Sequence, residues 1–167
     1  RSHRDRLGHL AHHDGLTGLP NRLALHRDLA ERLRAAGPAG GRLGFYLLDL
    51  DHFKAINDSA GHHVGDRFLC AVAERLRREL PDAASLYRIG GDEFVVVADD
   101  GAGPPAGARG DFDALAARLV EALRPPIEVV GWRMPACGSI GYAVHPDDGS
   151  TPTALLQCAD LALFAAK

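Results

Sequence analysis

The chain has 167 residues, 46% of them hydrophobic, and a formal net charge of −3 at pH 7. This length suits one domain with a buried core, and the slightly acidic balance argues against a protein that binds nucleic acid through a broad basic face. Three widely spaced cysteines, no secretory signal and no apolar run near the roughly 18 residues of a membrane span predict a cytoplasmic domain with reduced thiols.

Residues 1–13 are rich in charge and carry Leu7 and Leu10 at helical spacing. This pattern predicts the end of a helix that enters from an upstream domain, and a frayed N-terminal arm is the alternative. The chain opens on Arg1 rather than Met, so we expect it to be part of a longer protein. Other parts of that protein could attach it to a membrane.

The next elements alternate between helix and strand. Leucines at every fourth position predict a helix over residues 21–36, which the glycines and proline of 37–41 should end. A continuous apolar run over 43–50 predicts a buried strand with carboxylates at its C-terminal end. A turn region should follow, and then an amphipathic helix over 64–80 that stops at a proline.

The second half of the chain predicts two hairpins, each followed by a helix. The hairpins turn at Gly90-Gly91 and at Gly131-Trp132. Their strands cover residues 86–89, 94–98, 127–130 and 134–144, the helices cover 112–123 and 153–167, and a loop rich in Gly, Pro and Ala covers 101–110. Because hairpins interrupt the alternation, we predict an α/β (α+β) sandwich with a mainly antiparallel central sheet flanked by helices.

Acidic residues cluster where two of these strands end. Asp49 and Asp51 project to one face of their strand, and Asp92 and Glu93 follow the glycine turn. If the two strand ends are neighbours, the carboxylates converge, and like charges disfavour one another's ionisation. A divalent cation such as Mg²⁺ removes that cost, and two ions would activate an attacking oxygen and stabilise a leaving one. The alternative is a set of solvated turn acids, which we favour for Asp51 alone.

Several other residues suit a nucleotide. Gly90 and Gly91 lack a Cβ and would let phosphates approach the main chain, although a glycine pair by itself is common in hairpins. Lys54 offers a point charge for phosphate. Asn57 and Asp66 offer hydrogen-bonding groups for a guanine edge, whereas Asp66 could instead complement the dipole at the start of its helix.

Several motifs in series resemble the GGDEF family of bacterial diguanylate cyclases, and the resemblance extends from Asp14 to the end of the chain. The motifs lie at residues 14–22, 49–58, 61–66, 88–94, 139–141 and 159–167. The resemblance implies that residues 14–167 form a GGDEF domain. It also implies a core similar to that of nucleotidyl cyclases and polymerase palms.

The resemblance further implies a role for each matching residue. Asp92 and Glu93 would be the catalytic acids, and Mg²⁺ or Mn²⁺ would bind, two ions per active site. The metal ligands would be Asp49, the Leu50 carbonyl, Asp92 and Glu93. The substrate-binding residues would be Lys54, Asn57, Asp66, Gly90, Gly91 and Lys167, with Asn57 and Asp66 reading guanine and the lysines contacting phosphate.

The reaction that the resemblance implies joins two GTP molecules into cyclic di-GMP and releases two pyrophosphates. Each copy of the domain would hold one GTP, so the partner is a second copy, with no nucleic acid involved. A sensor or phosphodiesterase domain is the expected covalent neighbour. The alternatives are a catalytically silent GTP-binding domain that regulates such a neighbour and, less favoured, a purely structural dimerisation domain.

One departure from the family pattern concerns product inhibition. Many relatives carry an Arg-x-x-Asp pair five residues before the glycine turn, and this pair forms an inhibitory site for the product. Pro81 and Ala84 occupy the corresponding positions here and offer neither a guanidinium group nor a carboxylate. We therefore expect no inhibitory site of that kind.

Overall fold

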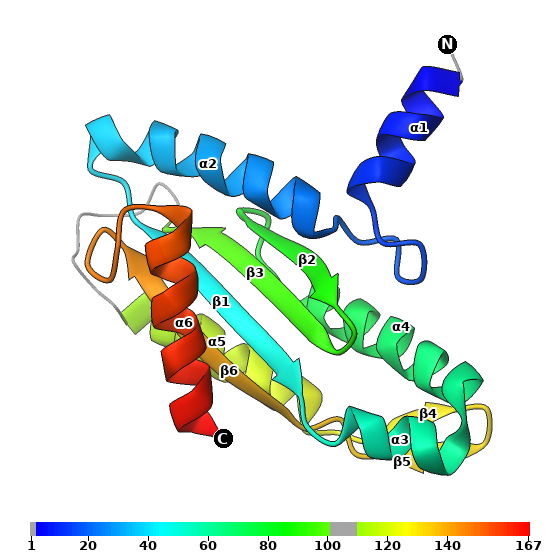
Figure 1. The fold of residues 1–167 in the computed structure, drawn as a ribbon. Helices are drawn as coiled ribbons and strands as arrows, with labels where there is room; N and C mark the ends of the chain where they lie inside the picture. Colours follow the sequence, from blue (N-terminus) through cyan, green and yellow to red (C-terminus); the bar gives the residue numbers. More distant parts are fainter. Residues whose placement is uncertain (1–2, 101–109) are drawn as a thin grey trace.

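A four-stranded sheet forms the middle layer of the structure, a computed structural model that describes residues 3–100 and 110–167. The strand order is β2-β3-β1-β6, and every neighbouring pair is antiparallel (Figure 1). The strands are β1 (Leu43–Leu50), β2 (Ala84–Gly90), β3 (Glu93–Asp99) and β6 (Gly138–His145). The predicted antiparallel central sheet is confirmed.

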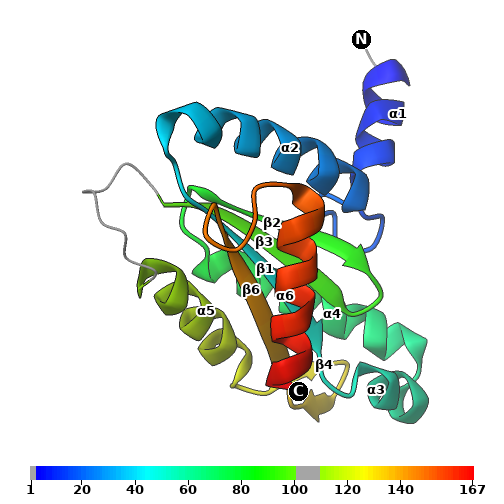
Figure 2. The ribbon, with the colours of Figure 1, turned by 60° about the vertical axis from the view of Figure 1, so that its left-hand side comes forward.

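Helices cover both faces of this sheet, so the fold has three layers (Figure 2). One face packs against α2 (Arg22–Ala39) and α6 (Pro152–Ala166), and the other packs against α4 (His62–Glu79) and α5 (Gly110–Leu123). The helices predicted over 64–80, 112–123 and 153–167 are therefore confirmed to within about two residues at each end.

Strand β1 is buried on both faces, which explains why its sequence is continuously apolar rather than alternating. Phe45 and Leu47 pack among the residues of α2 and α6, whereas Tyr46 and Leu48 pack toward α4 and α5. The strand predicted over 43–50 has the same bounds in the structure. Because alternate side chains point to opposite faces, Asp49 follows Leu47 toward the side of α2 and α6.

The sheet register brings the two predicted acidic segments to one edge. Asp49 near the end of β1 lies directly opposite Glu93 at the start of β3. The Leu50 N–H also donates a hydrogen bond of 3.1 Å to the Asp92 carbonyl. The C-terminal end of β1 and the β2–β3 turn are therefore neighbours, as the convergence of the carboxylates requires.

Two predictions about the first half of the chain are wrong. Helix α2 does not stop after Ala36 but continues through Gly37 and Pro38 to Ala39. The helix ends at Gly40, whose left-handed conformation (φ 68°) lets its N–H bond to the Ala36 carbonyl. The expected turn region after β1 contains a short helix instead, α3 (Phe53–Ala60). Phe53, Ile56 and Ala60 stand at helical spacing and pack against the core, a signal that sequence reasoning did not use.

The second predicted hairpin is also different in the structure. Its turn lies at Val130-Gly131, and it forms a separate two-stranded sheet from β4 (Ile127–Val129) and β5 (Trp132–Met134). The strand predicted over 134–144 is divided, because Pro135 cannot donate to a strand ladder and β6 begins only at Gly138. Of the loop predicted over 101–110, residues 101–109 lie outside the described residues, and Gly110 is the first residue of α5.

The N-terminal helix α1 (His3–His12) projects away from the sheet (Figure 1). Asn21 joins it to α2, because the Asn21 N–H bonds to the His12 carbonyl at 2.9 Å and its side chain bonds to the Ala11 carbonyl at 3.0 Å. Its role as the end of a linker helix stays a prediction. Over residues 3–100 and 110–167, none of the helices has the length and hydropathy that crossing a bilayer would require.

Helix α6 lies so close to β6 that Gly141 has no room for a side chain. A Cβ at this position would lie 2.1 Å from the Leu163 nitrogen and 2.2 Å from the Ala159 oxygen, both backbone atoms. We expect Gly141→Ala to lower the free energy of unfolding by about 1–3 kcal/mol, because overpacking forces the backbone to shift. Urea unfolding measures this change. In the control Gly37→Ala the new methyl group meets nothing within 4 Å, and equal losses in both variants would contradict the prediction.

Candidate active site

A pocket of about 500 Å³ lies where β1, the β2–β3 turn and the end of α6 meet. We call it the acid pocket. Its lining includes Asp49, Leu50, Asp51, Lys54, Asp92, Ser139 and Lys167. The structure thus brings together five of the predicted site residues, two from β1, two lysines from distant segments and one from the turn. It does not itself test the roles predicted for them.

The electrostatics of the acid pocket centre on Asp49 and Asp92. Burial of Asp92 raises the pKa of its carboxyl group, and the charge and hydrogen bonding of Asp49 raise it further. Lys167 donates a hydrogen bond to Oδ2 of Asp49, and this bond raises the pKa of the Lys167 ammonium group. The ammonium group therefore offsets part of the negative charge that the two carboxylates crowd together.

The second carboxylate oxygen of Asp49, Oδ1, shows that Lys167 neutralises the acid pocket only in part. Oδ1 of Asp49 is buried and has no hydrogen-bond partner, although the side chain as a whole is 16% exposed. A buried, unpaired carboxylate oxygen is costly, and a hard cation is its natural partner. Among the described residues no three His, Cys, Asp or Glu side chains form a ready metal site. The residues fit Mg²⁺ or Mn²⁺ held by two carboxylates and completed by substrate phosphates.

Glu93 lies on the same face of the sheet as Asp49 but outside the acid pocket. It lines a neighbouring hollow between α2 and α6, together with Arg22, His26 and Asp160. Its charge contributes to the raised pKa of Asp92, although less than Asp49 does. The structure therefore places the second predicted acid beside the first without directing both into one pocket.

The residues predicted to read guanine lie on α3 and α4, also outside the acid pocket. The Asn57 side chain rests against Gly65, where a Cβ would lie 1.8 Å from Asn57 Oδ1. That oxygen is buried and unpartnered, and Asp66 is exposed just after the first turn of α4. The sequence reasoning assigned no role to Gly65, whose missing side chain is what admits Asn57 to this position.

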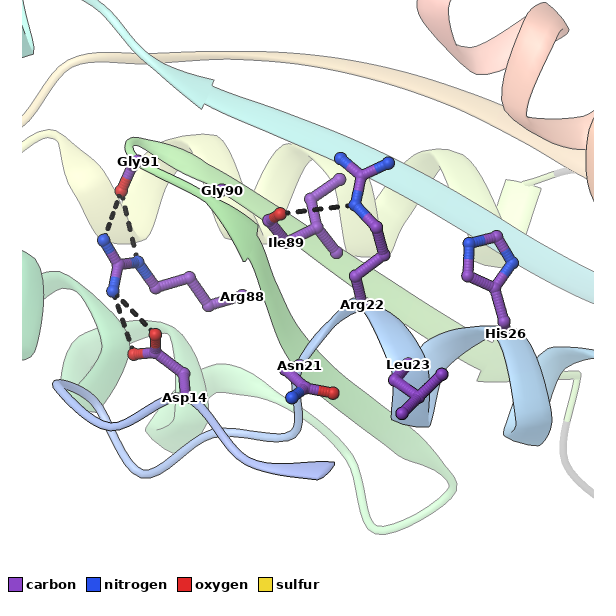
Figure 3. Close-up of a pocket in the computed structure, with 9 residues that line it drawn as sticks. All are labelled: Asp14, Asn21, Arg22, Leu23, His26, Arg88, Ile89, Gly90 and Gly91. Carbon is purple, nitrogen blue, oxygen red and sulfur yellow. Dashed lines mark hydrogen bonds and ion pairs between the residues drawn. The ribbon is translucent and has the colours of Figure 1, made fainter. Parts of the chain in front are cut away.

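The Gly90-Gly91 turn is held by Arg88. The Nε and Nη2 atoms of Arg88 donate to the Gly91 carbonyl at 3.1 and 2.9 Å, and Nη1 donates to both oxygens of Asp14 at 2.9 Å (Figure 3). Asp14 also accepts hydrogen bonds from the backbone and hydroxyl of Thr17. This network ties the glycine turn to the loop after α1. The turn glycines line a different pocket from the acids.

Sequence reasoning found the acids but missed these supporting contacts. It named Asp14 and Arg88 only as parts of motifs and gave neither a contact. The spacing of Asp14 and Thr17, three residues apart, is typical of a turn that an Asp side chain caps, and it could have predicted the Asp14–Thr17 hydrogen bonds. Asp51, interpreted as a solvated turn acid, lines the acid pocket and accepts a hydrogen bond of 3.1 Å from the Ser139 hydroxyl. No local signal predicted that contact.

An antiparallel sheet between helical layers, with acids at the end of its central strand, places the chain in the palm-like cyclase fold class. The family model described as "Diguanylate cyclase, GGDEF domain" matches residues 11–167. The chain therefore belongs to the GGDEF domain family, and the resemblance seen in its motifs is confirmed.

Similar proteins are known from several bacteria. An uncharacterized signaling protein of Caulobacter vibrioides is 41% identical over the whole chain, which covers 20% of that protein. The bifunctional diguanylate cyclase/cyclic di-GMP phosphodiesterase MucR of Pseudomonas aeruginosa is 40% identical over 95% of the chain and 22% of its own length. The solved GGDEF domain of TpbB from P. aeruginosa is 36% identical, with a TM-score of 0.85 and coverage of 93% of this chain and 88% of that one. The chain spans only about a fifth of the first two relatives.

The Asp14–Arg88 pair should make stability depend on pH. Burial opposes ionisation of Asp14, but hydrogen bonds from Thr17 and the Arg88 charge outweigh it and lower the pKa of Asp14. A lowered pKa contributes stability above the unfolded-state pKa near 3.9, and this contribution is lost as the pH falls through the folded-state value. We expect Asp14→Asn to cost about 1–3 kcal/mol at pH 7, and this cost should begin to shrink only when the pH falls below about 3.9 toward the lower folded-state pKa.

Urea unfolding of both proteins between pH 3 and pH 7 measures this difference. Glu74→Gln is the matched control, because Glu74 is 55% exposed and its ion pairs with Arg77 and Arg78 lie on the surface. Such exposed pairs contribute about 0–1 kcal/mol. A loss for Asp14→Asn that stays constant across this pH range would contradict the prediction.

Proposed function

We propose that this chain is a catalytically active diguanylate cyclase domain, which condenses two GTP molecules into cyclic di-GMP with release of two pyrophosphates. The observation that carries the proposal is the buried, unpartnered oxygen of Asp49 beside Asp92, in a chain of the GGDEF family. A purely structural domain gives no reason for two carboxylates crowded in one pocket. Their retention favours catalysis over a silent regulatory role.

In this proposal Asp49, Asp92 and the Leu50 carbonyl hold two Mg²⁺ or Mn²⁺ ions, with Glu93 as a further acid. When bound, the ions supply Lewis acidity and neutralise the charge that develops on the phosphoryl group. Lys54 and Lys167 contact the triphosphate from the walls of the same pocket. When GTP binds, its phosphates would become a second anionic partner for Lys167, which pairs with Asp49 in this structure.

The guanine base would lie against α3 and α4, where Asn57 and Asp66 read it. The Asn57 side chain offers an amide whose Oδ1 is unpartnered but buried against Gly65, so it would have to turn outward to meet the base. The exposed Asp66 carboxylate can accept hydrogen bonds from the N–H groups of the base. The Gly90-Gly91 turn lies between this region and α2. One copy positions one GTP, so the 3′-hydroxyl of a second GTP must come from a second copy of the domain.

The surroundings of the domain are part of the same proposal. The chain is a small part of its curated relatives, and one of these is bifunctional by name. We infer a covalently attached sensor or phosphodiesterase domain, α1 as the end of a linker helix, and a cytoplasmic location for the GGDEF domain. Pairing through the linker would then control activity.

Incubating the chain with GTP and Mg²⁺, after forcing dimerisation through an added coiled coil, tests the proposal. Chromatography with mass detection should find cyclic di-GMP and pyrophosphate. Asp92→Asn in the same dimer should form neither. GTP binding without product would favour the silent regulatory domain, and no GTP binding would favour a structural role.

The choice of GTP over ATP should depend on Asp66. We expect Asp66→Ser to lower the ratio of GTP to ATP turnover by about 10- to 100-fold, because a hydrogen bond to a charged group contributes about 1.5–3 kcal/mol. Competition assays with both nucleotides measure this ratio. Asp58→Ser, a neighbouring exposed acid on α3, is the control and should leave it unchanged. The same ratio in the natural chain and in Asp66→Ser would exclude this role.

Product inhibition through the usual family site should be absent. Pro81 is exposed and Ala84 begins β2, so this surface offers cyclic di-GMP neither a guanidinium fork nor a carboxylate. Initial rates should stay within about twofold when product is added. Calorimetry that finds tight cyclic di-GMP binding, abolished by Pro81→Glu, would contradict this prediction.

A further inference from the structure

A second pocket of about 500 Å³ lies on the other side of the glycine turn, between the start of α2 and the end of β2 (Figure 3). We call it the turn pocket. Its polar lining comes from the side chains of Asp14, Asn21, Arg22, His26 and Arg88 and from the backbone of Gly90 and Gly91. The Asp14 carboxylate is occupied by Arg88 and Thr17, and Arg22 and His26 also line the neighbouring hollow that contains Glu93 and Asp160. The turn pocket shares no lining residue with the acid pocket, yet Gly91 of one pocket and Asp92 of the other are consecutive in the chain.

The cations of the turn pocket differ in how they are used. Arg88 is fully engaged by Asp14 and the Gly91 carbonyl. Arg22 makes only a long hydrogen bond of 3.5 Å, from Nε to the Ile89 carbonyl. Its two terminal nitrogens have no partner among the described residues, and Figure 3 shows them directed away from α2, beside His26 one helical turn later. The pocket therefore presents an unpaired guanidinium group next to the turn.

The chemistry of an unpaired arginine fork suits a phosphate group, which it can bind through two parallel hydrogen bonds. A Cβ built on Gly91 would meet nothing within 4 Å, so an anion has open space at the turn. In the proposed function the phosphates of the copy's own GTP contact the glycine turn and the lysines Lys54 and Lys167 of the acid pocket. Arg22 does not line the acid pocket, so the occupant that we assign to it is a phosphate group of a second nucleotide.

We propose that Arg22 binds the α-phosphate region of the GTP held by the second copy. This inference rests on the proposed function, in which the GTP of one copy reacts with the GTP of a second copy. In a twofold arrangement each contact is made twice, so each copy would supply its Arg22 to the other's nucleotide. Arg22 would then be a catalytic residue that acts in trans, and His26 would border the same anion.

The acid pocket explains why such a residue is needed. The carboxylates of Asp49, Asp51 and Asp92 face only two lysines there. As the 3′-oxygen of one GTP forms its bond to the α-phosphorus of the other, the bond from that phosphorus to the pyrophosphate oxygen breaks. Pyrophosphate leaves, and the hydroxyl proton passes to solvent. Arg22 would offset negative charge on the phosphoryl oxygens, a role whose loss typically lowers kcat by about 100-fold or more.

Mixed dimers distinguish action in trans from action in cis. One pair joins an Arg22→Ala copy to an Asp92→Asn copy through a heterodimeric coiled coil. If Arg22 acts in trans, one site keeps its own acids and its partner's arginine, and the pair should release pyrophosphate at about half the natural rate. Homodimers of either variant should be at least about 100-fold slower.

The crossed arrangement gives the opposite expectation. A copy that carries both Arg22→Ala and Asp92→Asn is joined to a natural copy, whose intact acids now lack an arginine across the interface. This pair should be as slow as the homodimers. Activity here together with inactivity of the first pair would overturn the inference while leaving the proposed function standing. A natural homodimer that forms no dinucleotide would overturn both.

Binding to single copies supplies a readout that does not depend on turnover. A non-hydrolysable GTP analogue with Mg²⁺ should bind the monomeric natural chain and Arg22→Ala with affinities within about twofold, because the arginine serves the other copy. A tenfold or greater loss would show a contact in cis and refute the inference. Arg27→Ala, an exposed arginine on α2 that lines neither pocket, is the matched control and should keep full dimer activity.

Discussion

Two carboxylates pressed together at the end of a sheet impose the main constraint on this structure. Asp49 and Asp92 meet because β1 and β3 pair in a register that leaves both at one edge. Their proximity disfavours ionisation of Asp92, and Lys167 at the end of α6 offsets only part of the charge. The remaining buried oxygen of Asp49 has no donor. The site thus carries a negative charge that the protein's own groups neutralise only in part.

The glycine turn separates two pockets, one lined by the acids Asp49, Asp51 and Asp92 and the other lined by the arginines Arg22 and Arg88. Asp92 faces the acid pocket, while Gly90 and Gly91 face a pocket that contains the unpaired guanidinium group of Arg22. Arg88 holds the turn in place because its guanidinium group donates hydrogen bonds both to the Gly91 carbonyl and to the Asp14 carboxylate. The loop after α1 is therefore tied to the glycine turn through the hydrogen bonds of Asp14 and Arg88.

Sequence patterns predicted the fold where a pattern was long or bounded by strong turn chemistry. The apolar run of β1 and the helical period of α4 were sufficient to predict these two elements. A strand buried on both faces is continuously apolar, whereas a helix buried on one face is apolar only at helical spacing. The short helix α3 was missed, although Phe53, Ile56 and Ala60 at helical spacing were a signal for it. The division of residues 134–144 was missed as well, because strand pairing, rather than composition, decides where Pro135 interrupts a sheet.

The sequence by itself determined the local parts of the site: the strand that carries Asp49, the glycine turn before Asp92 and the membership of the GGDEF family. Only the tertiary structure decided which groups meet. Lys167 lies 118 positions from Asp49, and Arg88 lies 74 positions from Asp14, yet both pairs are in contact. Helical period and turn chemistry act over a few residues. These contacts depend instead on how strands pair and how helices pack across the sheet, which no short segment specifies.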